Sequence, residues 1–347
     1  MRRKSLFRLS SRSDWRRLRR NLMVMAMKLL FRVFALGLAG AFALLSLPAV
    51  AGGAAQRAVV VELYTSQGCN TCPPADALLG KLAQRPDVIA LSLPITYWDM
   101  LGWKDTLATD ANTRRQKAYA AAMGHGGVYT PQIIVDGVMD IIGSRQTNVE
   151  LAIAQREATI GQATAIALAD ARTQRALADA ARASEVASAG TAGVHAAAAA
   201  AAAARAQAAA APIPVTSVAP MTPGAPAMPV DVNVSVSVVQ SPSEMRIDIG
   251  GAPGQHNATV WMFHLRSQVT VNVGAGENAG HTVTYHNVVG DLRAVGVFKG
   301  QPITLTLPRA AMAGLPHDGV AVVVQQGGYG HVIGANYLSH PAYYPPR

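Results

Sequence analysis

The sequence predicts an α/β domain followed by an all-β, sandwich-like domain, and two patterns support this order. Between residues 57 and 155, short runs of branched apolar residues alternate with segments whose apolar residues repeat at helical spacing. Between residues 231 and 347, apolar residues recur at every second position in short runs that Gly and Pro separate. The first pattern is typical of a sheet covered by helices, and the second is typical of packed strands.

The α/β region has the expected order β-α-β-α-β-β-α. Pro73 can begin the first helix because its missing N–H costs nothing in a first turn, and Gly124 is a natural stop for the second helix. We expect strands at residues 58–64, 88–93, 130–137 and 138–142, and helices at residues 73–82, at 105–123 and from about 147 onward.

A composition change separates the two regions. Residues 156–230 are first Ala-rich and then Pro-rich, which predicts a helix followed by an extended linker, with 184–229 as a tether. In the last region, the expected strands cover residues 232–238, 245–249, 260–264, 282–289, 303–307 and 320–325.

Residues 1–51 have the pattern of a secretory signal peptide. A basic segment precedes an apolar run at 33–47, which is shorter than the ~20 residues of a membrane span. Ala49-Val50-Ala51 then forms a small-x-small cleavage sequence. We expect cleavage after Ala51 and a periplasmic or secreted protein without a stable membrane anchor; a retained anchor is the alternative. Met27 begins a complete signal by itself and is a possible true start.

The charge of the chain argues against nucleic-acid binding. The sequence has 30 Lys and Arg against 20 Asp and Glu, but 11 of the bases and one acid lie in residues 1–51. The rest of the chain holds 19 of each and is formally neutral. A nucleic-acid partner is therefore not expected, since it requires a basic face on the folded domain.

Both cysteines of the chain lie in the stretch YTSQGCNTCPP, directly after the first expected strand. A C-x-x-C pair at a helix start in an α/β domain predicts a thioredoxin-like redox motif, because the helix N-terminus stabilises a thiolate. We expect Cys69 to be the exposed nucleophile and Cys72 the buried resolving thiol, with protein thiols and disulfides and an unknown redox partner as partners. No cofactor is expected. A helix that begins only at Pro73 would leave Cys69 farther from its N-terminus.

Thr130-Pro131 is the second sign of the same chemistry. A proline at the start of a central strand is unusual, and in the thioredoxin fold a cis-proline at this place faces the C-x-x-C. The segment VYTPQIIVDG resembles the matching part of a glutaredoxin. We expect a cis peptide bond and a substrate groove formed by Thr130, Pro131 and Trp98. Asp99, Trp103 and Lys104 either join this contact or pack their loop.

Two further side chains are open to interpretation, and so is the class of function. His125 can face Cys69, where it would stabilise the thiolate or ligate a metal, or it can be an exposed loop residue. Glu62 is expected to be a partly solvated strand residue; the alternative is the buried acid that thioredoxins keep near their cysteine pair. The alternative to an oxidoreductase is a non-catalytic binding module, possibly for copper, because sulfur ligands select soft metals. Two cysteines are too few for a structural zinc site, so no metal site is assigned. A purely structural bond is less favoured, because so short a loop stabilises little.

Several motifs together resemble a family of exported bacterial proteins catalogued as domain of unknown function 1223. These are VELYTSQGCNTCPPADALL, YWDMLGWKD, RRQKAYA, VYTPQIIVDG, GENAGHTVTYHNVVGDLRAVGVFKG and VVVQQGGYGHVIGAN. The resemblance implies a thioredoxin-like fold and no established activity. The chain departs from the family at Pro94-Ile95-Thr96, where a His-Val-Asp-like triplet is usual. Any role of that His is lost or replaced in this chain.

Overall fold

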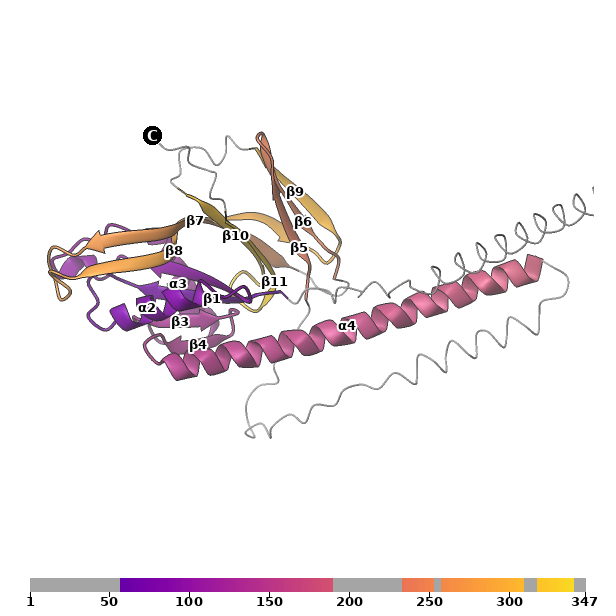
Figure 1. Cartoon of the computed structure of the whole chain (residues 1–347), viewed down its shortest axis with the longest axis horizontal. Helices are drawn as coiled ribbons and strands as arrows, with labels where there is room; N and C mark the ends of the chain where they lie inside the picture. Colours follow the sequence, from indigo (N-terminus) through magenta and orange to yellow (C-terminus); the bar gives the residue numbers. More distant parts are fainter. Residues whose placement is uncertain (1–56, 190–232, 253–256, 309–316, 340–347) are drawn as a thin grey trace, which may run out of the picture. The chain divides into compact units, whose positions relative to one another are not determined.

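The computed structural model describes residues 57–189, 233–252, 257–308 and 317–339 (Figure 1). The expected signal peptide and the tether from residue 190 onward lie outside these residues. The described strands form an eight-stranded mixed sheet and a separate three-stranded antiparallel sheet. No helix in the described part of the chain is both long and apolar enough to cross a membrane.

The large sheet begins with a βαβ unit. Strand β1 (Val59–Thr65) is followed by helix α2 (Pro73–Leu82) and by strand β2 (Val88–Pro94), which pairs with β1 in parallel. Strand β3 (Gln132–Val135) pairs antiparallel on the other side of β1, and β4 (Met139–Ile142) pairs with β3. This arrangement confirms the expected thioredoxin-like core.

Helices cover both faces of β1, which explains why its sequence is mostly apolar. Because successive side chains on a strand point to opposite faces, the odd-numbered positions 59, 61 and 63 pack against α2 and α4 (Gln146–Ala189). Val60 and Tyr64 pack on the other face with Tyr119 of α3 (Asp110–Ala122). A strand buried on both sides reads as a continuous apolar run.

Helix α3 begins later than the sequence predicts. Thr109 has extended backbone and its hydroxyl accepts a hydrogen bond from the N–H of Asn112 at 3.1 Å, so it is the N-cap. Asp105, where the helix was expected to begin, instead accepts hydrogen bonds from the N–H groups of Gln67 and Leu107, both at 2.8 Å. The expected start was therefore wrong, because Asp105 fastens the loop before the helix. A 3-10 turn, η1 (Asp99–Leu101), lies in that loop.

The β-rich region continues the large sheet, in which the strand order is β11-β10-β7-β8-β2-β1-β3-β4. A parallel bridge between Ser92 of β2 and Val288 of β8 joins the two parts. Strand β11 had no counterpart in the sequence prediction. The four strands of this part are β7 (Ala258–Asn272), β8 (Thr282–Phe298), β10 (Gly319–Gln326) and β11 (Val332–Ser339).

The three-stranded sheet packs face to face against this extension. It consists of β5 (Val236–Gln240), β6 (Glu244–Ile249) and β9 (Ile303–Pro308). Met245 and Ile247 of β6 share a buried cluster with Val260 of β7 and Val322 of β10. Two sheets that bury one face each against the other give the sandwich-like part of the fold that the alternating pattern predicts.

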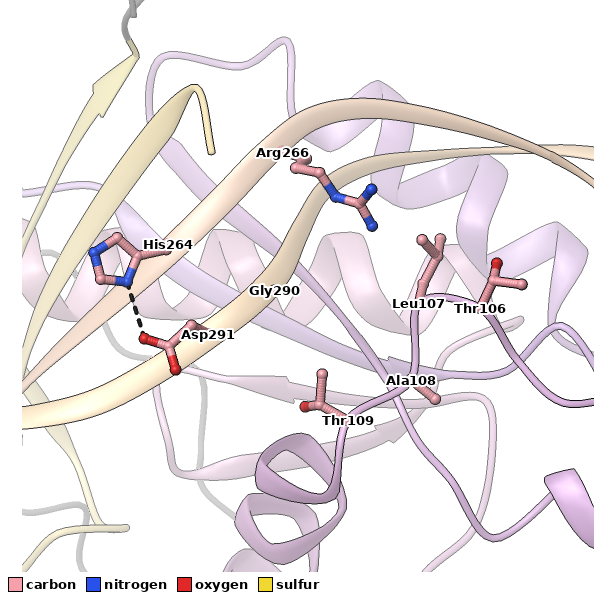
Figure 2. Close-up of a pocket in the computed structure, with 8 residues that line it drawn as sticks. All are labelled: Thr106, Leu107, Ala108, Thr109, His264, Arg266, Gly290 and Asp291. Carbon is pink, nitrogen blue, oxygen red and sulfur yellow. Dashed lines mark hydrogen bonds and ion pairs between the residues drawn. The ribbon is translucent and has the colours of Figure 1, made fainter. Parts of the chain in front are cut away.

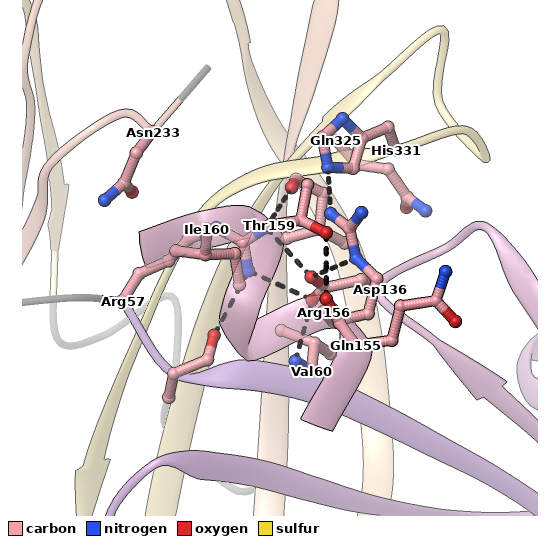
Figure 3. A network of polar contacts seen from close by, with 12 residues as sticks. Arg57, Val60, Asp136, Gln155, Arg156, Thr159, Ile160, Asn233, Gln325 and His331 are labelled. Carbon is pink, nitrogen blue, oxygen red and sulfur yellow. Dashed lines mark hydrogen bonds and ion pairs between the residues drawn. The ribbon is translucent and has the colours of Figure 1, made fainter. Parts of the chain in front are cut away.

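Two buried polar networks connect the parts of the sheet. In the first, Asp136 accepts hydrogen bonds from Arg57 at 2.9 and 3.0 Å, from Arg156 at 3.1 Å and from the N–H of Val60 at 2.9 Å (Figure 3). Burial would raise the pKa of Asp136, but the charges of Arg57 and Arg156 outweigh it and hold the pKa below its ordinary value. Arg57 also donates to the carbonyl oxygen of Val332 at 2.6 Å.

The second network corrects the expectation for Glu62. Its side chain is 1% exposed and accepts hydrogen bonds from Arg115 at 2.6 and 2.8 Å and from Tyr119 at 2.7 Å. Arg115 also donates to Gln325 of β10 at 3.0 Å. The prediction of a partly solvated residue was wrong, because α3 and β10 cover this face and supply the partners.

Candidate functional site

The two cysteines form a disulfide in the loop between β1 and α2. Helix α2 begins at Pro73, and Cys72 is its N-cap residue. The N–H of Cys72 donates to the carbonyl oxygen of Cys69 at 3.2 Å, so Cys69 lies in the turn that precedes the helix. The influence of a helix terminus fades within its first turn. Cys72, rather than Cys69, is therefore the cysteine at the helix end.

The disulfide is shielded from solvent. The side chains of Cys69 and Cys72 are both 0% exposed, although Asn70 and Thr71 between them are exposed. The expectation that Cys69 would be exposed is wrong for this state of the molecule, because the surrounding chain covers both sulfur atoms. A reagent thiol cannot reach the bond without a movement of that cover.

The expected groove residues lie together beside the pair. The peptide bond between Thr130 and Pro131 is cis, as predicted. The Nε1–H of Trp98 donates to the hydroxyl of Thr130 at 2.8 Å, and the Trp98 Cβ lies 3.3 Å from where a Cβ on Gly68 would stand. Trp98 therefore connects the loop before Cys69 to the cis peptide bond.

His125 lies beside an acidic side chain of β4. Its Nε2 is 3.2 Å from a carboxylate oxygen of Asp140 on β4, and its side chain is 44% exposed. The hydroxyl of Tyr129 donates to the same carboxylate at 2.5 Å. In the part of the chain that the structure describes, no His, Cys, Asp or Glu side chains gather in a group of three or more that could hold a metal ion.

Asp76 is a buried acid that the sequence reasoning missed. It lies one helical turn after Cys72, is 3% exposed, and neither of its carboxyl oxygens has a partner at hydrogen-bonding geometry among the described residues. Burial raises its pKa to about 8; the nearby Thr65 hydroxyl lowers it in part and the charge of Asp105 raises it further. The sequence did contain one sign that Asp76 is buried. Asp76 precedes the core residue Leu79 by three positions, so both lie on the same side of α2.

The tip of the β7–β8 hairpin also reaches the cysteine loop. Asn278 is buried, and its Nδ2 donates to the carbonyl oxygens of Gln67 at 2.9 Å and of Cys69 at 2.8 Å. The Nε1–H of Trp103 donates to the side-chain oxygen of Gln67 at 2.8 Å. The sequence gives no sign of the Asn278 contacts, because the partners are separated by more than 200 residues.

Comparison with known proteins now gives the family. The family described as protein of unknown function, DUF1223, matches residues 60–212 and 215–325. The chain is a DUF1223 protein. No curated protein matches it. The crystal structure of protein AGR_C_4864 from Agrobacterium tumefaciens is similar over 84% of this chain and 100% of that chain, with 28% identity and a TM-score of 0.56. HBP35 of Porphyromonas gingivalis matches 84% of this chain and 79% of that one, with 11% identity and a TM-score of 0.42.

The DUF1223 protein also has a pocket that neither cysteine lines (Figure 2). It lies between the loop before α3 and strands β7 and β8, and none of its lining residues belongs to the expected groove. Burial, together with the charge of His317, lowers the pKa of His264 to about 4 even though Asp291 lies 3.2 Å from its Nδ1. The lining residues are Thr106, Leu107, Ala108, Thr109, His264, Arg266, Gly290 and Asp291.

Proposed function

We propose that the protein is an exported thiol–disulfide oxidoreductase that uses Cys69 and Cys72. The observation that carries the proposal is a C-x-x-C disulfide at the start of α2 on a thioredoxin-like sheet, with Trp98 connecting the loop before Cys69 to the cis bond before Pro131. The signal-like residues 1–51 support export, and a disulfide agrees with it, because disulfides persist in oxidising compartments.

The reaction transfers two electrons between the cysteine pair and a protein substrate. When the pair is reduced, the Cys69 thiolate attacks one sulfur of a substrate disulfide, and the other substrate sulfur leaves as a thiolate. Cys72 then loses its proton and attacks Cys69, which breaks the mixed disulfide and releases the second substrate thiolate. The substrate leaves with two thiols after protonation, and Cys69–Cys72 is oxidised. A partner dithiol then reduces Cys69–Cys72 again. The same steps in reverse order, starting from the oxidised pair, form a disulfide in the substrate.

Neighbouring groups support this sequence of steps. In the proposed reaction the backbone at Thr130, immediately before the cis bond, pairs with an extended substrate, and the Trp98 hydrogen bond supports this role by holding the Thr130 side chain. Asp76 keeps its proton at neutral pH because its pKa is about 8. A buried acid one helical turn from Cys72 suits a reaction in which the buried thiol must gain and lose a proton.

Redox titration of the purified protein tests the proposal. The fraction of Cys69–Cys72 disulfide is measured by thiol trapping in glutathione and dithiothreitol buffers. A reversible midpoint between about −270 and −120 mV fits an exchange catalyst, and a potential below about −300 mV fits a structural bond and contradicts the proposal.

Turnover of a protein disulfide is measured in parallel. We expect Cys69→Ser to abolish multiple turnover, and Trp98→Phe to reduce kcat/KM while the potential changes little. Lys117→Gln, at an exposed position on α3, is the control and should retain activity. Unchanged turnover in Cys69→Ser would rule out the assigned nucleophile.

A further inference from the structure

Access limits any exchange at this pair. An attacking thiolate must reach a cysteine sulfur along the direction of the bond that breaks. Both cysteine side chains are 0% exposed, so this approach is closed in the structure. Some segment that covers the pair must move before the disulfide can react.

The best candidate for that segment is the tip of the β7–β8 hairpin, residues 273–281. Asn278 holds it to the cysteine loop by its two hydrogen bonds to the carbonyl oxygens of Gln67 and Cys69. The N–H of Asn70 points at a carboxylate oxygen of Glu277 over a long 3.4 Å. These contacts place the tip directly on the turn that contains the disulfide.

Trp103 forms a second contact between the tip and the loop. A Cβ on Gly274 would lie 2.9 Å from the Trp103 ring, so the backbone of the tip lies close against that ring. The same ring donates its Nε1–H to Gln67. Gly276 has a φ of 78°, which suits a glycine in the sharp turn of the tip.

The hairpin behind the tip has little support from the rest of the sheet (Figure 1). Strand β10 pairs with β7 only as far as Leu265, and β2 pairs with β8 only at Val288. Among the described strands, residues 266–272 and 282–287 therefore pair only with each other. A two-stranded ribbon in water is marginally stable at best.

The ribbon is held by a small cluster that is separate from the three larger cores. In this cluster the buried residues Leu107, Tyr285 and Val288 meet the partly buried Val269 and Val271. Segments with few buried apolar contacts open locally at lower free energy than the whole protein unfolds. The base of the ribbon is also anchored, because the His286 ring lies close against Gly80 of α2. In the tip, by contrast, Val273 and Asn278 are the buried residues, so the segment over the cysteine turn has few buried apolar contacts of its own.

We propose that the hairpin tip is a lid over the Cys69–Cys72 disulfide and that Asn278 is its latch. The inference rests on the proposed exchange function and adds its regulation: a partner reacts only when the lid is lifted. The lid holds the oxidised pair away from small thiols. A protein partner that displaces the tip from Gln67 and Cys69 can then reach the Cys69–Cys72 disulfide.

The rate of disulfide reduction by dithiothreitol tests the lid. One reagent thiolate attacks a cysteine sulfur, its second thiol closes the reagent into a ring, and two cysteine thiols remain. Asn278→Ala removes both latch hydrogen bonds. Asn278→Asp keeps the size of the side chain, but its carboxylate cannot donate a hydrogen bond to the two carbonyl oxygens. We expect each variant to be reduced on the order of 10-fold faster or more. Asn272→Ala is the matched control, because Asn272 is exposed in the same hairpin and contacts Thr282.

The unmodified protein gives a second test that needs no variant. If local lifting of the lid admits the reagent, the logarithm of the reduction rate rises with urea far less steeply than global unfolding requires. A slope equal to that of global unfolding overturns the lid. So do reduction rates of both Asn278 variants within twofold of the rate of the unmodified protein.

The outcomes separate the lid from the proposed function. Faster reduction of the Asn278 variants, combined with a potential below about −300 mV and no turnover, supports a lid over a structural bond. Unchanged reduction rates combined with a potential in the catalytic range and normal turnover refute the lid and leave the oxidoreductase in place.

Discussion

Asp76→Asn tests the buried acid most directly. Both carboxyl oxygens of Asp76 are buried without a hydrogen-bond partner at good geometry among the described residues. Burial, with a contribution from Asp105, raises the pKa from 3.8 to about 8 in the folded protein. An amide of nearly the same shape cannot ionise, so the variant removes this titration without opening a cavity.

The sign of the effect follows from proton binding. Between about pH 4 and 8, folded Asp76 keeps a proton that the unfolded chain has already released. Its contribution to stability is therefore complete below about pH 4 and is lost as the pH rises through about 8. Because one pKa unit corresponds to about 1.4 kcal/mol, the loss is at most about 6 kcal/mol. That is a large part of the ~5–15 kcal/mol stability of a typical domain.

Urea unfolding at a series of pH values, with the disulfide intact, measures this loss. We expect the free energy of unfolding of Asp76→Asn, minus that of the unmodified protein, to rise with pH by up to about 1.4 kcal/mol per unit. Taking this difference removes the titration of groups common to both proteins. Asp179→Asn, at a position with a 61% exposed side chain on α4, should give a flat difference. A flat difference for Asp76→Asn between about pH 5 and 8 would refute the assignment.

Three further predictions concern other parts of the fold. Arg115→Met should lower the free energy of unfolding by about 3–5 kcal/mol in urea titrations, because it leaves the Glu62 carboxylate buried without its cation; a loss below about 1 kcal/mol contradicts this. The His264 ring should titrate near pH 4 by NMR, and a midpoint at the ordinary 6.5 would show that burial does not govern it. Gly137→Ala should destabilise by about 2 kcal/mol or more in thermal unfolding, because φ is 74° and a Cβ would lie 2.1 Å from a carbonyl oxygen; Gly126→Ala, with open space, should change little.

Local chemistry made much of the core predictable from the sequence. Pro73 and the apolar spacing of α2 gave the bounds 73–82, which the structure confirms. The Thr130–Pro131 bond is cis as expected. In each case the deciding interaction lies within a few residues along the chain or follows from the restricted backbone of proline.

The parts that failed depend on distant partners. Glu62 looked solvated because nothing near it in sequence balances its charge, yet Arg115 lies 53 residues away and pairs with it. Cys69 looked exposed because the residues that lie over its turn come from a hairpin about 209 residues later. Asp105 looked like a helix start because its partner Gln67 belongs to the preceding loop. Periodicity and capping rules describe neighbours along the chain and carry no information on such pairs.

The long reach of the buried arginines has a consequence for the order of folding. Arg57 donates to a carbonyl oxygen 275 residues later, and Arg115 donates to Gln325 after 210 residues. Contacts of such high sequence separation form slowly, because the chain must close large loops first. In a chain that enters an oxidising compartment from its N-terminus, Cys69 and Cys72 meet the oxidant before the last strands arrive. Under the proposed export, the bond would form early in an open turn and would be enclosed only when the C-terminal half completes the sheet.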